Sequence, residues 1–187
     1  GVGQRPQPRG VGVTAEQLSR DRVQSLSPSR AADFMNCPLL YRFRVIDRLP
    51  EPPSAEATRG SMVHAVLERL FDLAAADRTP AGAAGMVEAE WERLLEVEPE
   101  LAGLFAGDDD GAAFGAWLDS ARTLLERYFT LEDPTRLEPR QREMYVETTL
   151  DSGLRLRGYI DRLDVTADGD MRVVDYKSGR APHESFE

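Results

Sequence analysis

Two aspartates and a lysine near the C-terminal end of the sequence have the types and spacing needed for metal-assisted hydrolysis. Asp161 lies in one stretch of alternating apolar residues, and Asp175 and Lys177 lie two residues apart in the next. Side chains two residues apart on a strand point to the same face, so Asp175 and Lys177 should point the same way. Lys177 is also the only lysine among 23 basic residues. Arginine cannot replace lysine where the chemistry needs a compact ammonium group with an adjustable pKa.

A predicted hairpin brings the two carboxylates together. Residues 154–165 and 171–176 alternate as strands do, and residues 167–170 are typical of a turn between them. In a hairpin centred near residue 168, Asp161 lies opposite Asp175. Two carboxylates this close repel one another unless a cation neutralises them. Mg²⁺ or Mn²⁺ suits such an oxygen site, with the backbone carbonyl of Tyr176 as a further ligand.

A divalent ion held there would polarise a phosphodiester and activate a bound water, and Lys177 could orient that water or stabilise charge on the phosphate. The alternative is a surface hairpin whose charges form cross-strand ion pairs, which is the commoner situation for aspartate and lysine. The apolar neighbours of the charged residues favour the metal site, because a surface hairpin does not require Ile160, Leu163 and Val174.

Residues 158–164 (GYIDRLD) and 173–179 (VVDYKSG) closely resemble the RecB-type branch of the PD-(D/E)XK nucleases. The resemblance implies a central mixed sheet flanked by helices, and Mg²⁺- or Mn²⁺-dependent hydrolysis of DNA phosphodiesters. It implies that Asp161 and Asp175 bind the metal as catalytic residues and that Lys177 is the catalytic lysine. With this resemblance, the leading expectation is a DNA exonuclease or endonuclease in repair or recombination, of which the exonuclease is preferred. DNA is the expected substrate, and a helicase or another recombination protein is the expected partner.

The same branch carries a histidine ligand within a Gly-x-x-x-His pattern on an upstream helix. Gly60 and His64 have this spacing at the start of an amphipathic stretch. A lone histidine at the start of a helix is more often structural. The two strand motifs downstream nevertheless favour metal ligation by His64.

Two features depart from the pattern of the branch. Relatives carry a Gln-x-x-x-Tyr motif on a helix after the lysine strand, whereas Gln141 and Tyr145 have that spacing before the catalytic strands, which we interpret as coincidence. Cys37 is the only cysteine and resembles the upstream cysteine of relatives that hold a [4Fe–4S] cluster. Such a cluster needs four thiolates, so it is expected only in a longer parent chain. The alternative for Cys37 is a buried, small apolar residue.

The expected fold is of the α/β class in α+β order, with a restriction-endonuclease-like core. N-terminal helices precede an antiparallel three-stranded meander of a mixed central sheet. Residues 1–24 are expected to be a flexible segment and residues 25–187 a nuclease domain, with its helical part at 26–131 and its catalytic strands at 142–178. A sheet with only helices before it has an open edge and an uncovered face, so further elements are expected after residue 187.

Apolar spacing and capping residues locate the individual elements. Ser27 and Pro28 are the expected N-cap and first residue of a helix that Pro38 should interrupt or kink. The elements expected after it are a loop over 50–58, helices over 61–76, 85–97 and 111–130, and a first strand over 143–150.

The charge distribution leaves alternative functions open. The net charge is −10, and residues 51–135 alone carry −12. This composition does not by itself favour DNA binding. It keeps open a non-catalytic DNA-binding or scaffolding module, or an acidic helical region that binds a partner such as a helicase. The sequence has no apolar run long enough to span a membrane, and its single cysteine fits a reducing, cytoplasmic setting.

Overall fold

The structure is a computed structural model that describes residues 25–179. The expected flexible segment over 1–24 therefore lies outside the described residues. The chain divides into two compact units. The described part of the first contains residues 25–50 and 146–158, and that of the second contains residues 51–145 and 159–179.

The first unit begins with the short strand β1 (Ser25–Leu26) and the helix α2 (Pro28–Asn36). The Ser27 side chain accepts a hydrogen bond from the N–H of Arg30, and Pro28 occupies the first turn. This capping geometry satisfies a backbone donor that the helix itself leaves free, and it confirms the predicted helix start.

A proline interrupts the helical path directly after α2. Cys37 has an extended backbone with a φ of −158°, and a new helix α3 (Pro38–Tyr41) follows. The π-helix η1 (Arg42–Ile46) continues from α3. The predicted interruption at Pro38 is confirmed, because the proline ring cannot continue the preceding helix.

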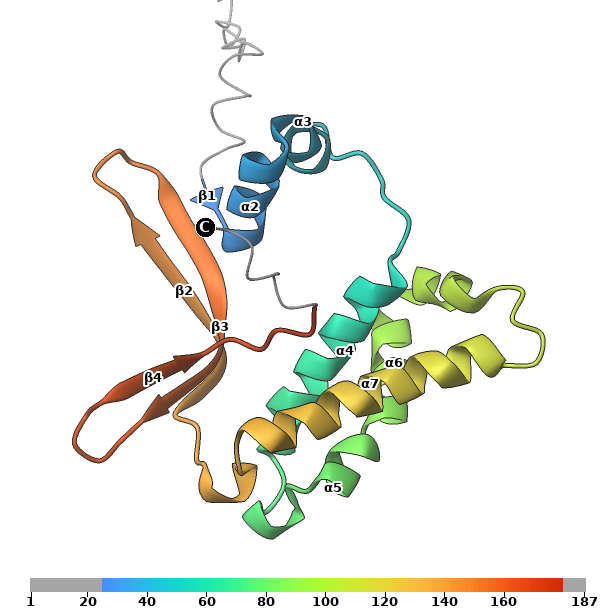
Figure 1. Cartoon of the computed structure of the whole chain (residues 1–187). Helices are drawn as coiled ribbons and strands as arrows, with labels where there is room; N and C mark the ends of the chain where they lie inside the picture. Colours follow the sequence, from blue (N-terminus) through green and yellow to red (C-terminus); the bar gives the residue numbers. More distant parts are fainter. Residues whose placement is uncertain (1–24, 180–187) are drawn as a thin grey trace, which may run out of the picture. The chain divides into compact units, whose positions relative to one another are not determined.

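The second unit is helical up to its strands. Its helical elements are α4 (Ala55–Leu70), η2 (Ala75–Asp77), α5 (Pro80–Ala84), α6 (Val87–Val97), η3 (Pro99–Phe105), α7 (Ala112–Leu131) and η4 (Pro134–Arg136). Figure 1 shows α4, α6 and α7 packed together. The predictions over 85–97 and 111–130 are confirmed, since α6 and α7 begin and end within two residues of them.

Helix α4 begins earlier than the sequence predicted. The Ser54 side chain accepts a hydrogen bond from the N–H of Ala57, so the cap lies before the predicted start at residue 61. The helix ends at Leu70 rather than near residue 76. The expected loop over 50–58 is therefore wrong in its second half, where small residues continue the helix toward the cap.

One hydrophobic cluster forms the core of the second unit. The α4 residues Val63, Val66, Leu67 and Leu70 are buried in it, as their spacing predicted. Aromatic residues from α6, η3 and α7 pack against them with ring centroids 5.1 to 6.2 Å apart: Trp91, Phe105, Phe114 and Trp117. This core buries one side of α4.

The strands form a mixed four-stranded sheet that contains the three predicted strands and β1, which the sequence did not predict. They are β2 (Gln141–Thr149), β3 (Arg155–Val165) and β4 (Met171–Val174). β3 pairs in parallel with β1 and antiparallel with β4, and the order along the sheet is β1-β3-β2. Gly169 at the β3–β4 turn has a φ of +90°, which favours glycine.

The register of the β3–β4 hairpin agrees with the predicted one. Arg162 pairs with Val174 and Val165 with Met171, so the hairpin is centred on residue 168. β4 ends at Val174 rather than at residue 176. Asp175 and Lys177 therefore follow the strand and are not part of its hydrogen-bonded ladder.

None of the helices within residues 25–179 combines the length and the apolar character that a membrane span requires.

Candidate metal centre

Helix α4 supplies His64 from a face that is not fully covered by the core. Its neighbours Met62 and Val63 are buried, whereas the His64 side chain keeps 29% of its surface exposed. One turn earlier, a Cβ on Gly60 would lie 2.8 Å from the hydroxyl of Ser178. The absence of a side chain at Gly60 thus lets the segment after β4 approach the helix closely. In the predicted pattern, Gly60 therefore allows a close backbone approach, whereas His64 offers a side chain to the site.

Strand β2 supplies Glu143, which the sequence reasoning missed. Its backbone has a φ of +44°, a conformation that non-glycine residues rarely adopt. Burial, followed by the negative charges of Asp161 and Glu68, raises the pKa of Glu143. A strained backbone and a disfavoured charge at one residue are costs that a folded protein tolerates mainly at functional positions.

The neighbouring Arg142 ties this end of β2 to α4. Its guanidinium donates hydrogen bonds to the backbone carbonyl of Glu68 and, at 2.8 Å, to the carboxylate of Asp72. These contacts fix the direction from which Glu143 approaches the helix. The motif spelling around Gln141 gives no hint of this role, and the positive φ of Glu143 cannot be read from sequence.

Strand β3 supplies Asp161, whose side chain is only 11% exposed. Its Oδ2 lies 3.7 Å from Nδ1 of His64. The same oxygen accepts a hydrogen bond of 2.5 Å from the backbone N–H of Tyr176. Asp161 is thus held between α4 and the segment that follows β4.

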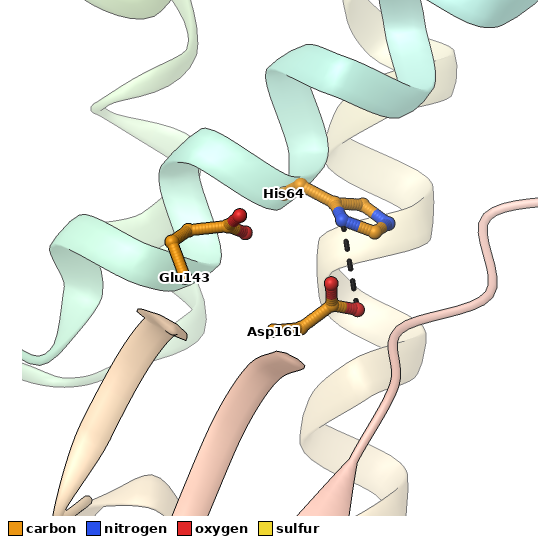
Figure 2. A group of neighbouring side chains, drawn as sticks. All are labelled: His64, Glu143 and Asp161. Atoms are coloured by element: carbon orange, nitrogen blue, oxygen red, sulfur yellow. Dashed lines mark ion pairs between the residues drawn. The ribbon is translucent and has the colours of Figure 1, made fainter. Parts of the chain in front are cut away.

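Figure 2 shows His64, Glu143 and Asp161 converging from α4, β2 and β3. One ligand atom of each lies within 4.8 Å of the others. A hollow lined by Gly60, His64, Glu68 and Glu143 opens beside them. Two carboxylates and one imidazole form an oxygen and nitrogen donor set of the kind that divalent metals take in proteins.

The charge balance also suits a cation. Within residues 25–179, no arginine or lysine forms an ion pair with Glu143 or Asp161, and the imidazole of His64 is the one basic group paired with Asp161. Burial and then repulsion from neighbouring carboxylates raise the pKa of Glu143, and a divalent ion would offset both by stabilising the charged carboxylate. The residues present therefore fit the metal that the sequence predicted.

Asp175 and Lys177 lie apart from this ligand group. Their side chains are 57% and 80% exposed, and Lys177 Nζ lies 2.5 Å from Asp175 Oδ2. Among the described residues, the ligand cluster consists of His64, Glu143 and Asp161 and does not include Asp175. The predicted metal ligation by Asp175 and by the carbonyl of Tyr176 therefore stays a prediction.

Tyr176 points inward between these two exposed side chains. It is partly buried and packs against the hydrophobic cluster, and its ring meets that of His64 edge-on at 5.9 Å. Burial raises the pKa of its hydroxyl. The segment that carries Asp175 and Lys177 is consequently anchored by the tyrosine between them.

Cys37 lies in the first unit, between α2 and α3, and is exposed. The alternative of a buried apolar residue is therefore wrong, because the thiol faces outward from the kink at Pro38. The [4Fe–4S] cluster in a longer parent chain stays a prediction.

Comparison with known proteins identifies the family of the chain. The PD-(D/E)XK nuclease superfamily matches residues 25–187, and the chain belongs to that superfamily. It is 28% identical over 192 residues to the Gene 69 protein of Mycobacterium phage D29, covering 91% of this chain and 68% of the phage protein. It is 27% identical over 176 residues to an ATP-dependent helicase/deoxyribonuclease subunit of Streptococcus mutans, covering 90% of this chain. The chain spans only 15% of the length of that streptococcal protein.

Proposed function

We propose that this chain is a metal-dependent nuclease that hydrolyses DNA phosphodiesters as an exonuclease in repair or recombination. The convergence of His64, Glu143 and Asp161 beside a lysine-bearing segment carries the proposal. Membership of the PD-(D/E)XK nuclease superfamily supports nuclease chemistry. The name of one relative supports DNA as the substrate, because it includes the word deoxyribonuclease.

In this proposal Mg²⁺ or Mn²⁺ is held by His64, Asp161 and Asp175, with the carbonyl of Tyr176 as a further ligand. Glu143 joins them, since its carboxylate lies within reach of both His64 and Asp161. The bound ion would supply Lewis acidity toward a phosphoryl oxygen and a water of lowered pKa. The protein's own task is to hold these donors and to keep the scissile phosphate beside Lys177.

Lys177 is proposed as the catalytic lysine. Its ammonium is highly exposed and is held 2.5 Å from the Asp175 carboxylate. In that position it can donate hydrogen bonds to a phosphate oxygen and orient the attacking water. Tyr176, partly buried between the two residues, keeps them on one face of the segment.

The test is digestion of linear and circular duplex DNA with Mg²⁺, with Mn²⁺ and with EDTA. Nucleotides should be released from linear DNA but not from circular DNA, and only with a metal ion present, because an exonuclease needs a free DNA end. Lys177→Ala should lower the rate by about 100-fold or more. Arg136→Ala, which removes an exposed positive charge on η4, should not. Cleavage that is unchanged in Lys177→Ala would overturn the proposed mechanism.

A second candidate is a DNA-binding or scaffolding module that keeps the fold without cleaving. The ion pair between Lys177 and Asp175 favours it, because a paired ammonium is less available to a phosphate. Metal-dependent DNA binding in a mobility-shift assay, with no product over hours, would support this candidate instead.

The remaining expectations concern partners, place and cluster. The acidic helical region over 51–135 is proposed to bind a helicase or another recombination protein, and the word helicase in the name of one relative supports this. A cytoplasmic location is proposed with it. We propose a [4Fe–4S] cluster only for a longer chain that contains these residues, and an iron assay and a visible absorption spectrum of such a chain would test whether Cys37 holds part of it.

A further inference from the structure

Arg162 directly follows the candidate ligand Asp161 and points to the opposite side of β3. It is fully buried, with 0% of its surface exposed. A buried guanidinium is costly unless each of its donors is paired. Its contacts therefore indicate what its charge achieves at this position.

Two carboxylates hold the guanidinium. Glu132, directly after α7, accepts from both terminal nitrogens, at 2.8 Å from Nη2. Asp164, two residues along β3, accepts from Nε at 3.1 Å and from Nη2 at 3.2 Å. Burial opposes the charged form, but these hydrogen bonds and charges raise the pKa of Arg162 above its ordinary value. The guanidinium is thus a fixed, permanently charged donor.

The Nη1 atom of Arg162 also donates to two tyrosine hydroxyls. That of Tyr176 lies at 2.9 Å and that of Tyr128 on α7 at 3.3 Å. The guanidinium also lies over the Tyr176 ring, 5.8 Å from its centroid. Both hydroxyls accept from Arg162, and that of Tyr128 also donates to Glu132, but only Tyr176 continues into the candidate metal centre.

Tyr176 lies outside β4, which ends at Val174, so its backbone N–H is not part of the strand ladder. That N–H donates to Asp161 Oδ2, the oxygen nearest His64. A chain of contacts therefore runs from Arg162 through the Tyr176 hydroxyl and backbone to the Asp161 carboxylate. It returns to the residue directly before Arg162.

We infer that Arg162 is a positioning residue for the candidate metal centre, acting through Tyr176 to hold the Asp161 carboxylate toward His64. The inference rests on the proposed function, because it takes Asp161 as a metal ligand. Groups that orient a metal ligand commonly change metal affinity about 10- to 100-fold when they are removed. A merely structural arginine would change stability without changing metal affinity.

The test compares Tyr176→Phe with Tyr128→Phe. Each substitution removes one hydroxyl that accepts from Arg162 Nη1 and leaves the ring in place. Mn²⁺ binding is measured by calorimetry on the metal-free protein and by electron paramagnetic resonance, and thermal unfolding is followed in parallel. These readouts do not depend on DNA cleavage.

Tyr176→Phe is expected to weaken Mn²⁺ binding by about 10-fold, whereas Tyr128→Phe stays within about twofold of the unsubstituted protein. Tyr128→Phe should unfold at the lower temperature of the two, because it also loses the hydrogen bond to Glu132. Equal affinities for the two variants would overturn the inference and leave the metal centre standing. Failure of the unsubstituted protein to bind Mn²⁺ would overturn the proposed function and the inference with it.

Discussion

Two acidic clusters lie near β3, and their charges are handled in opposite ways. In one, the carboxylates of Glu132 and Asp164 meet the guanidinium groups of Arg162 and Arg172. Burial opposes ionisation of Glu132, but hydrogen bonds from Arg162 and Tyr128 and the nearby positive charges hold its pKa below the ordinary value. This cluster is balanced within the protein.

In the other cluster, the imidazole of His64 is the only basic side chain near Glu143 and Asp161 among the described residues. Here burial and neighbouring carboxylates raise the pKa of Glu143. Asp161 and Arg162 are adjacent in sequence, and alternation along the strand sends them to different clusters. The comparison teaches that an acidic cluster indicates a cation site where the protein leaves its charge unbalanced.

Neutralising one aspartate in each cluster tests whether the two clusters have different roles, and the largest effects are expected here. Asp161→Asn should abolish Mn²⁺-dependent cleavage, lowering the rate by about 100-fold or more, while thermal stability without metal is retained. Asp164→Asn should keep Mn²⁺ binding and lower the free energy of unfolding by about 3 kcal/mol, because it leaves a buried guanidinium partly unpaired. Urea unfolding and a nuclease assay on both variants measure the two effects. Similar phenotypes would contradict the distinction.

A second prediction concerns the pH dependence of the balanced cluster. The pKa of Glu132 is lowered in the folded protein, so its contribution to stability is present above its ordinary value of 4.5. That contribution is lost as the pH falls through the lower, folded-state pKa. Glu132→Gln should therefore destabilise the protein by about 2 kcal/mol at pH 7, and the difference should shrink in acid. Urea unfolding between pH 3 and pH 7 is the measurement, and a difference that is constant with pH would contradict it.

The variant Glu143→Gln tests what the third side chain of the unbalanced cluster contributes to metal binding. Removing this carboxylate should weaken Mn²⁺ binding by about 10-fold without lowering the stability of the metal-free protein, because it relieves repulsion. Glu126→Gln, on the exposed face of α7, is the matched control and should change neither quantity. Calorimetry and thermal unfolding check both. A large loss of metal-free stability in Glu143→Gln would show that the carboxylate has a structural partner instead.

The smallest expected effect tests the close approach between α4 and the segment after β4. Gly60→Ala places a methyl group 2.8 Å from the Ser178 hydroxyl and should cost about 1 kcal/mol of stability. The double variant Gly60→Ala with Ser178→Ala should recover it, since the Cβ of Ser178 lies 3.9 Å away. Thermal unfolding of the single and double variants measures the recovery, and its absence would place the strain elsewhere.

Much of the fold could be predicted because local signals agreed with one another. Ser27 and Pro28 located a helix start, and strand alternation with the turn near residue 168 located the register that places Asp161. Glu143 could not be found in this way. Its role depends on a left-handed backbone and on the hold of Arg142 on α4, and both arise from tertiary contacts.

The start of α4 and the length of β4 also differ from the predicted bounds, for reasons that periodicity does not contain. The cap at Ser54 determines the start of α4, whereas the apolar pattern of the helix begins several residues later. β4 ends at Val174 because Tyr176 bonds to a side chain, Asp161, instead of to a neighbouring strand. Periodicity predicts which way residues point, but it does not predict which backbone groups leave a ladder.

The positions of the three converging side chains in the sequence also determine when the site can form during synthesis. His64 and Glu143 are 79 residues apart in the chain, and Asp161 follows 18 residues later. Contacts over such separations form late in folding, because the intervening chain must first be ordered. During synthesis, a ribosome-bound chain cannot assemble the site until the third ligand has emerged. The cleaving activity proposed for the protein would therefore be withheld from every unfinished or misfolded copy.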